Sequence, residues 1–130
     1  MTPAETRAHY RKYIEALITG GYRDLKPYVN DEVTYNGRKL TRADYENMLA
    51  NDHDVIPDLY FHIDLLVVEG GDIACKLDFN CTPVKKFLGM EPNGKKISFS
   101  EHVFYRLRNG RISEVRSLID RDAVARQFAE

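Results

Sequence analysis

One stretch, residues 95–119, constrains the fold more than any other. It reads KKISFSEHVFYRLRNGRISEVRSLI, in which two alternating runs are separated by Asn109-Gly110. Both turn residues accept a positive φ, so the pattern predicts a β-hairpin. Because successive side chains of a strand point to opposite faces, each run should have one inward and one outward face.

The inward face of the first run carries a single acid, Glu101, in an otherwise apolar row: Ile97, Phe99, Val103, Tyr105 and Leu107. On the second run, Val115, Ser117 and Ile119 share a face. A carboxyl group on an apolar face is costly unless it is paired, hydrogen-bonded or neutralised. Two interpretations of Glu101 stay open. It is an acid–base group with a raised pKa in a pocket, or a structural acid that pairs with a tyrosine or arginine or reaches solvent.

Composition favours one globular domain over residues 1–130, since the chain is 43% hydrophobic and 30% charged. The net charge of −1 and the absence of a basic face argue against nucleic acid or an anionic membrane as a partner. The apolar runs are too short to span a bilayer, and we expect no signal peptide. Cys75 and Cys81 lie too far apart along one run to bridge, which fits a reducing cytoplasm. No metal-ligand spacing is present.

The first half of the chain predicts three helices and one strand. Thr2-Pro3-Ala4-Glu5 is a capping box that starts a long helix, and Gly20-Gly21 ends it. We expect a short helix capped by Asp24, a strand over 32–36 turned by Asn36-Gly37, and a helix over 42–50. The triplet Asp52-His53-Asp54 should fall in a solvated loop over 51–58.

The second half predicts antiparallel strands. Residues 59–68 should form a strand with one inward row: Phe61, Ile63, Leu65 and Val67. A second strand follows over 73–82. The loop 83–94 has an apolar content unusual for a surface loop, so it should fold back as a lid or rim or pack on the last helix. A last helix starts at Asp120 or Asp122. The predicted class is α+β: a cone-shaped, curved antiparallel sheet wrapped around the N-terminal helices.

Three motifs, in this order of elements, resemble the SnoaL-like polyketide cyclase family of the nuclear transport factor 2-like superfamily: PDLYFHI at 57–63, FLGMEPNGK at 87–95 and RLRNGRISE at 106–114. The resemblance covers nearly the whole chain and implies acid–base chemistry without a metal or cofactor. When the family's pattern is matched at Gly110-Arg111-Ile112, its catalytic acid falls on Ser117 and its glutamine partner falls on Glu101. The first helix is also similar to that of ketosteroid isomerases, which implies an oxyanion hole made by Tyr13 and Glu101.

These observations lead to one functional expectation and two alternatives. We expect a cofactor-free cyclase or isomerase that binds a small hydrophobic carbonyl compound, with Glu101 moving a proton and Tyr13 or Tyr35 polarising an oxygen. The expected ligand-binding residues are Ile14, Leu17, Phe61, Phe87, Met90, Phe99, Val103, Val115 and Ser117. The first alternative is a non-catalytic binding module. The second is an interaction domain that forms a homodimer through Phe104 and Leu118 on the outer sheet face.

Overall fold

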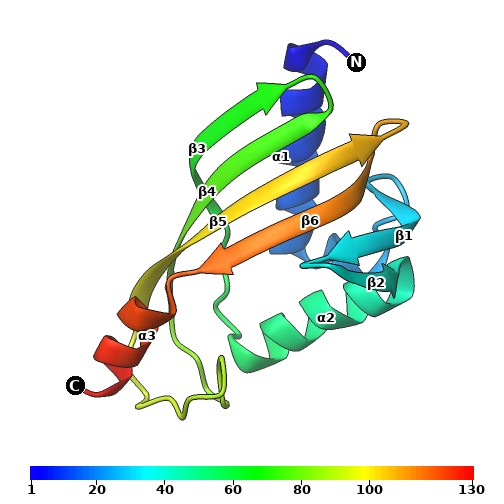
Figure 1. The fold of residues 1–130 in the computed structure, drawn as a ribbon. Coiled ribbons are helices and arrows are strands. Elements are labelled where there is room, and N and C mark those ends of the chain that lie inside the picture. Colours follow the sequence, from blue (N-terminus) through cyan, green and yellow to red (C-terminus); the bar gives the residue numbers. More distant parts are fainter.

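A curved six-stranded sheet with helices packed against it makes up the computed structural model, which describes all residues from 1 to 130 (Figure 1). The elements are α1 (Pro3–Thr19), the short 3₁₀ helix η1 (Gly21–Arg23), β1 (Val29–Tyr35), β2 (Arg38–Thr41), α2 (Arg42–Val55), β3 (His62–Glu69), β4 (Asp72–Cys81), β5 (Ile97–Arg108), β6 (Arg111–Ile119) and α3 (Arg121–Phe128). The strand order is β2-β1-β6-β5-β4-β3, and the sheet does not close on itself. The predicted α+β class is confirmed.

The long hairpin organises this sheet as the sequence predicts. β5 and β6 pair antiparallel, and Asn109 and Gly110 take φ values of 54° and 77° in the turn between them. β5 also pairs with β4 over ten positions, from Asp72↔Arg106 to Cys81↔Ile97. One pair departs from the predicted antiparallel arrangement: β1 runs parallel to β6. The sheet is therefore mixed, and the β1–β2 hairpin extends it beyond β6.

Helix α1 lies across one face of the sheet, behind β3 to β6 in the view of Figure 1. Its capping box is formed by Thr2 and Glu5, and Gly20 ends it with a φ of 93°. Its buried residues are Thr6, Tyr10, Tyr13, Ile14 and Leu17. These face the inward rows of the strands, so helix and sheet share one cluster of 24 buried hydrophobic residues.

The predicted inward row of β3 is only half correct. The register shifts between Ile63 and Leu65, so Asp64 is an extra residue on β3. Because one extra residue reverses which side chains face the core, Leu65 and Val67 point outward, each about 60% exposed. Leu66 and Val68 take the inward places and pack against the core.

The first half of the chain differs from the prediction in one helix end, one absent helix and one additional strand. Helix α2 runs to Val55, five residues beyond the expected end at position 50, so Asp52 and His53 are helical rather than part of a solvated loop. No helix follows Asp24; Leu25 accepts hydrogen bonds from Tyr28 N and Val29 N in a turn. Residues 38–41 form strand β2, which the sequence pattern did not indicate.

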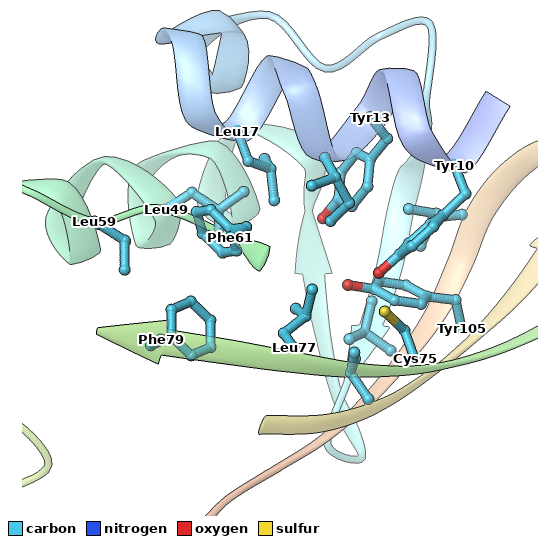
Figure 2. Close-up of a cluster of buried hydrophobic side chains, with 14 of the residues drawn as sticks. Tyr10, Tyr13, Leu17, Leu49, Leu59, Phe61, Cys75, Leu77, Phe79 and Tyr105 are labelled. Atoms are coloured by element: carbon cyan, nitrogen blue, oxygen red, sulfur yellow. The ribbon is translucent and has the colours of Figure 1, made fainter. Parts of the chain in front are cut away.

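Tyrosines are concentrated in the core between α1 and the sheet. Figure 2 shows Tyr10 and Tyr13 reaching from α1 toward Tyr105 of β5, with the hydroxyls of Tyr10 and Tyr105 close to the Cys75 sulfur. The Tyr10 and Tyr105 ring centroids are 5.1 Å apart. Cys75 and Cys81 are both buried and free, as their spacing predicts. None of the helices has the length and apolar composition needed to cross a membrane.

Candidate functional site

Glu101 lies on the inward face of β5, half-buried in the row between Phe99 and Val103. Its carboxylate accepts a hydrogen bond from the Ser117 hydroxyl on β6. Burial raises the pKa of Glu101, and the Ser117 hydrogen bond partly opposes the rise because it stabilises the ionised form. No arginine or lysine forms an ion pair with this carboxylate. Glu101 is therefore a desolvated acid held by one hydroxyl.

The β1–β2 turn holds the Ser117 backbone in place. The Asn36 side chain donates to Ser117 O at 3.2 Å and accepts from Ser117 N at 2.7 Å. Its own backbone N donates to Val115 O at 2.9 Å. Asn36 has a φ of 47°, a conformation that asparagine tolerates better than most residues. This turn thus fixes the strand position from which Ser117 reaches Glu101.

Three tyrosines surround the carboxylate on the side of the helices. The Tyr13 and Tyr45 hydroxyls form a buried hydrogen bond at 2.6 Å, and the Tyr45 and Tyr35 ring centroids are 6.2 Å apart. Burial raises the pKa of all three hydroxyls, and the charge of Glu101 adds to the rise. Tyr35 is the half-buried member of the group, and the neighbouring Ser117 hydroxyl lowers its pKa. All three are therefore neutral hydrogen-bonding groups at physiological pH.

Asp52 of α2 is the site residue that the sequence analysis missed. It is half-buried, on the same helix face as Tyr45, Leu49 and Ile56. Burial raises its pKa to about 7, and the charge of Glu101 contributes to the rise. The signal was present in the sequence: Asp52 lies seven residues after Tyr45 and three after Leu49, a spacing that keeps all three on one helix face.

A row of phenylalanines continues from Glu101 toward the open end of the sheet. Phe61, Phe79, Phe99 and Phe87 follow one another with ring-centroid distances of 5.4, 5.0 and 5.4 Å. Phe87 belongs to the loop between β4 and β5, where Phe87 and Met90 exchange backbone hydrogen bonds. Arg121 of α3 donates to Leu88 O at 2.7 Å. The loop thus folds back over the apolar end of the inner face.

The predicted site residues fall into three groups in the structure. Val103, Val115, Ser117 and Tyr35 lie around Glu101. Phe61, Phe87, Met90 and Phe99 belong to the apolar end. The third group, Tyr13, Ile14 and Leu17, is nearly fully buried between α1 and the sheet.

A surface hollow lies on the other side of the sheet. It is lined by Val67, Ala74, Phe104 and Arg116, whose backbones stand in one row across four strands. These side chains point away from Glu101, so the hollow belongs to the outer face and not to the carboxyl site. No group of three or more His, Cys, Asp or Glu side chains is arranged to hold a metal ion.

Comparisons with known proteins agree with this architecture. The model of the SnoaL-like polyketide cyclase family matches residues 7–128. The crystal structure of a SnoaL-like polyketide cyclase from Agrobacterium tumefaciens strain C58 is 35% identical, with a TM-score of 0.90 over 94% of this chain and 96% of that protein. A search of curated protein sequences gave no significant match. The chain therefore belongs to the SnoaL-like polyketide cyclase family.

More distant structures share the fold alone. TsrD from Streptomyces laurentii is 18% identical, with a TM-score of 0.88 over 98% of this chain and 97% of that protein. AclR from Streptomyces galilaeus, for which hydroxylase activity has been suggested, is also 18% identical, with a TM-score of 0.81 over 98% of both chains.

Proposed function

We propose that the protein is a cofactor-free cyclase or isomerase that enolises a small hydrophobic carbonyl compound on the inner face of the sheet. Glu101 is the base that removes a proton from the carbon next to the carbonyl group. The phenylalanine row from Phe61 to Phe87 binds the apolar part of the ligand. Tyr35 donates a hydrogen bond to a ligand oxygen, a role supported by its half-buried position beside Ser117. Tyr13, bonded to Tyr45, supports the polar end from behind.

The observation that carries this proposal is the environment of Glu101. A carboxylate with a raised pKa, one hydroxyl donor and no cation is a stronger base than a solvated one. Such a group abstracts protons most effectively when its pKa approaches the working pH. Membership of the SnoaL-like polyketide cyclase family supports a carbonyl ligand.

Hydrogen exchange of a ketone tests the chemistry without knowledge of the natural ligand. The bicyclic ketone 2-tetralone is incubated with the protein in D₂O, and loss of its α-hydrogen signals is followed by NMR. We expect the wild-type protein to accelerate exchange and Glu101→Gln to lose about 100-fold or more of that acceleration. Glu32→Gln, an exposed glutamate of β1, is the matched control and should keep the full rate.

Two results would contradict the proposal. One is wild-type protein that does not accelerate exchange, which would favour a non-catalytic binding module. The other is Glu101→Gln protein that is as active as the wild type.

The outer sheet face supports a second proposal, a homodimer. Phe104 is 60% exposed and Leu118 is 74% exposed, and Leu65 and Val67 lie on the same face. Large apolar side chains gathered on one face are typical of a protein–protein contact. A second copy is the proposed partner because a two-fold axis lets one face cover itself. The buried free thiols of Cys75 and Cys81 support a reducing, cytoplasmic location.

A further inference from the structure

A second carboxyl group faces the sheet from the opposite wall. The inward face of α2 is formed by Tyr45, Leu49 and Asp52, followed by the C-cap residue Ile56, and all of these except Asp52 are buried and apolar or aromatic. Asp52 takes part in no ion pair. An acid on the packed face of a helix is as unusual there as Glu101 is on the strand. The inner wall thus holds two acids on different elements.

Two tyrosines lie between the acids: the ring of Tyr45, on the helix face of Asp52, is 6.2 Å from that of Tyr35, which adjoins the Ser117 hydroxyl that bonds Glu101. The charge of Glu101 raises the pKa of Asp52, and the charge of Asp52 raises those of Tyr35 and Tyr45. The titratable groups around the pair come from three further elements and from β5 itself, and all are neutral at physiological pH: Tyr13 of α1, Tyr35 of β1, Cys75 of β4, and Tyr105 of β5. On α2 itself, Tyr45 is bonded to Tyr13 and His53 stacks on Tyr22 at 4.4 Å. No cation separates the two acids.

Building on the proposed function, we propose that Asp52 is the second catalytic residue of the site, the acid that protonates the carbonyl oxygen while Glu101 removes the carbon-bound proton. The C–H electron pair forms the C=C bond, and the C=O π pair takes the proton of Asp52. The products are an enol, a protonated Glu101 and an ionised Asp52. The reverse transfers, with the proton returned to the same or another carbon, restore both acids. No cofactor or further reactant enters this balance.

The roles of base and acid are assigned by asking which of the two carboxyl groups, Glu101 or Asp52, loses its proton more readily. Glu101 carries the hydroxyl donor that favours its ionised form, and its charge then holds the proton on Asp52. Asp52 has no such donor, so we assign the ionised state to Glu101 and the proton to Asp52. The neighbouring tyrosines are much weaker acids, because burial raises the pKa of each hydroxyl above its ordinary value near 10. Asp52 is thus the best proton donor of this wall.

The ligand class follows from this arrangement. The donor lies on α2 and the base on β5, so a productive ligand presents its oxygen to the helix and its acidic C–H to the sheet. Its apolar remainder extends along the phenylalanine row. An enolisable ketone or β-keto ester fused to a ring system has this distribution of groups.

The 2-tetralone exchange assay with Asp52→Asn tests the assignment. We expect a fall of about 100-fold or more, while Asp54→Asn, an exposed aspartate two residues along α2 that pairs with Lys85, should stay within about twofold of the wild type. The wild-type rate should decline above about pH 7, as Asp52 loses its proton. This decline should be absent in Asp52→Asn.

Failure of this assignment is distinguishable from failure of the proposed function. If Glu101→Gln abolishes exchange while Asp52→Asn keeps both the rate and the high-pH decline, Asp52 is not the acid and the proposed function stands. If Glu101→Gln keeps the rate, both proposals fail. A ¹³C NMR titration of the aspartate carboxyls gives an independent readout. Asp52 should titrate near pH 7, and its pKa should fall in Glu101→Gln; an unchanged pKa would exclude coupling between the two acids.

Discussion

Asp52 illustrates how one side chain can serve a site at the expense of stability. Its pKa of about 7 in the folded protein lies above the ordinary value of 3.8, so the folded state binds the proton more tightly than the unfolded state. The free energy of unfolding must therefore fall as pH rises from about 4 to about 7. Below this window Asp52 is protonated in both the folded and the unfolded state, so its ionisation no longer lowers the free energy of unfolding.

Ionisation of Asp52 lowers the free energy of unfolding, so replacing this residue with a neutral one should stabilise the protein at high pH. Asp52→Asn should unfold at a higher denaturant concentration than the wild type at pH 8, with a gain on the order of 2 kcal/mol, because a neutral amide need not be ionised in a half-buried place. At pH 4 the two proteins should be nearly equally stable. Urea unfolding at both pH values measures the difference. Asp54→Asn serves as the control; a gain of the same size there, or a gain independent of pH, would show that desolvation of the Asp52 carboxylate is not the cause.

At the scale of single elements, the β1–β2 turn is predicted to matter for its side chain and not only for its backbone. Asn36 and Asn109 both have a positive φ and both precede a glycine in a hairpin turn. Asn36 alone bonds Ser117 through both atoms of its amide. Asn36→Gly keeps the turn conformation and removes these two bonds, so unfolding should become easier by about 1–2 kcal/mol.

Asn109→Gly provides the matched comparison, since it changes the same residue at the same backbone conformation without loss of such bonds. We expect its free energy of unfolding to stay within about 0.5 kcal/mol of the wild type. Chemical denaturation of the two variants measures the difference. Equal effects of the two substitutions would show that the amide of Asn36 does not hold Ser117.

The same elements show how far the sequence could predict the structure. The β5–β6 hairpin was predictable because a strict alternation and an Asn-Gly turn agree on one register. For β3, residues 65–68 are Leu-Leu-Val-Val, so the apolar pattern fits either face and the extra residue at Asp64 leaves no trace in it. The end of α2 was hidden because Asn51, Asp52, His53 and Asp54 are polar and weak helix formers.

The candidate site was partly predictable for the same reasons. Glu101 stood out because it interrupts a row whose direction was already fixed by the hairpin. Asp52 did not, because its role depends on where α2 ends and on which face then meets the sheet. Those are consequences of tertiary packing, which overrides local preference.

For the whole molecule, the outer sheet face predicts self-association. In sedimentation velocity, the wild-type protein should move as a species of about twice the 15.0 kDa chain mass. Phe104→Glu should shift it to the monomer, because it replaces a large exposed apolar side chain with a charge that must be desolvated in the contact. Val84→Glu introduces the same charge at an exposed apolar residue of the loop between β4 and β5 and should leave the dimer intact. A wild-type monomer at micromolar concentration would exclude the contact.

The extra residue in β3 sets which side chains of this strand face the core and which face the outer side of the sheet. If Asp64 paired in the regular alternation instead of being an extra residue, Leu65 and Val67 would turn toward α1, and the outer face would lose two of its four large exposed apolar side chains. Deletion of Asp64 would leave Ile63 and Leu65 as consecutive paired residues, so Leu65 and Val67 would stay on the outer face. The irregular pairing at Asp64, and not the apolar composition of β3, therefore decides which of its side chains are available for the proposed contact.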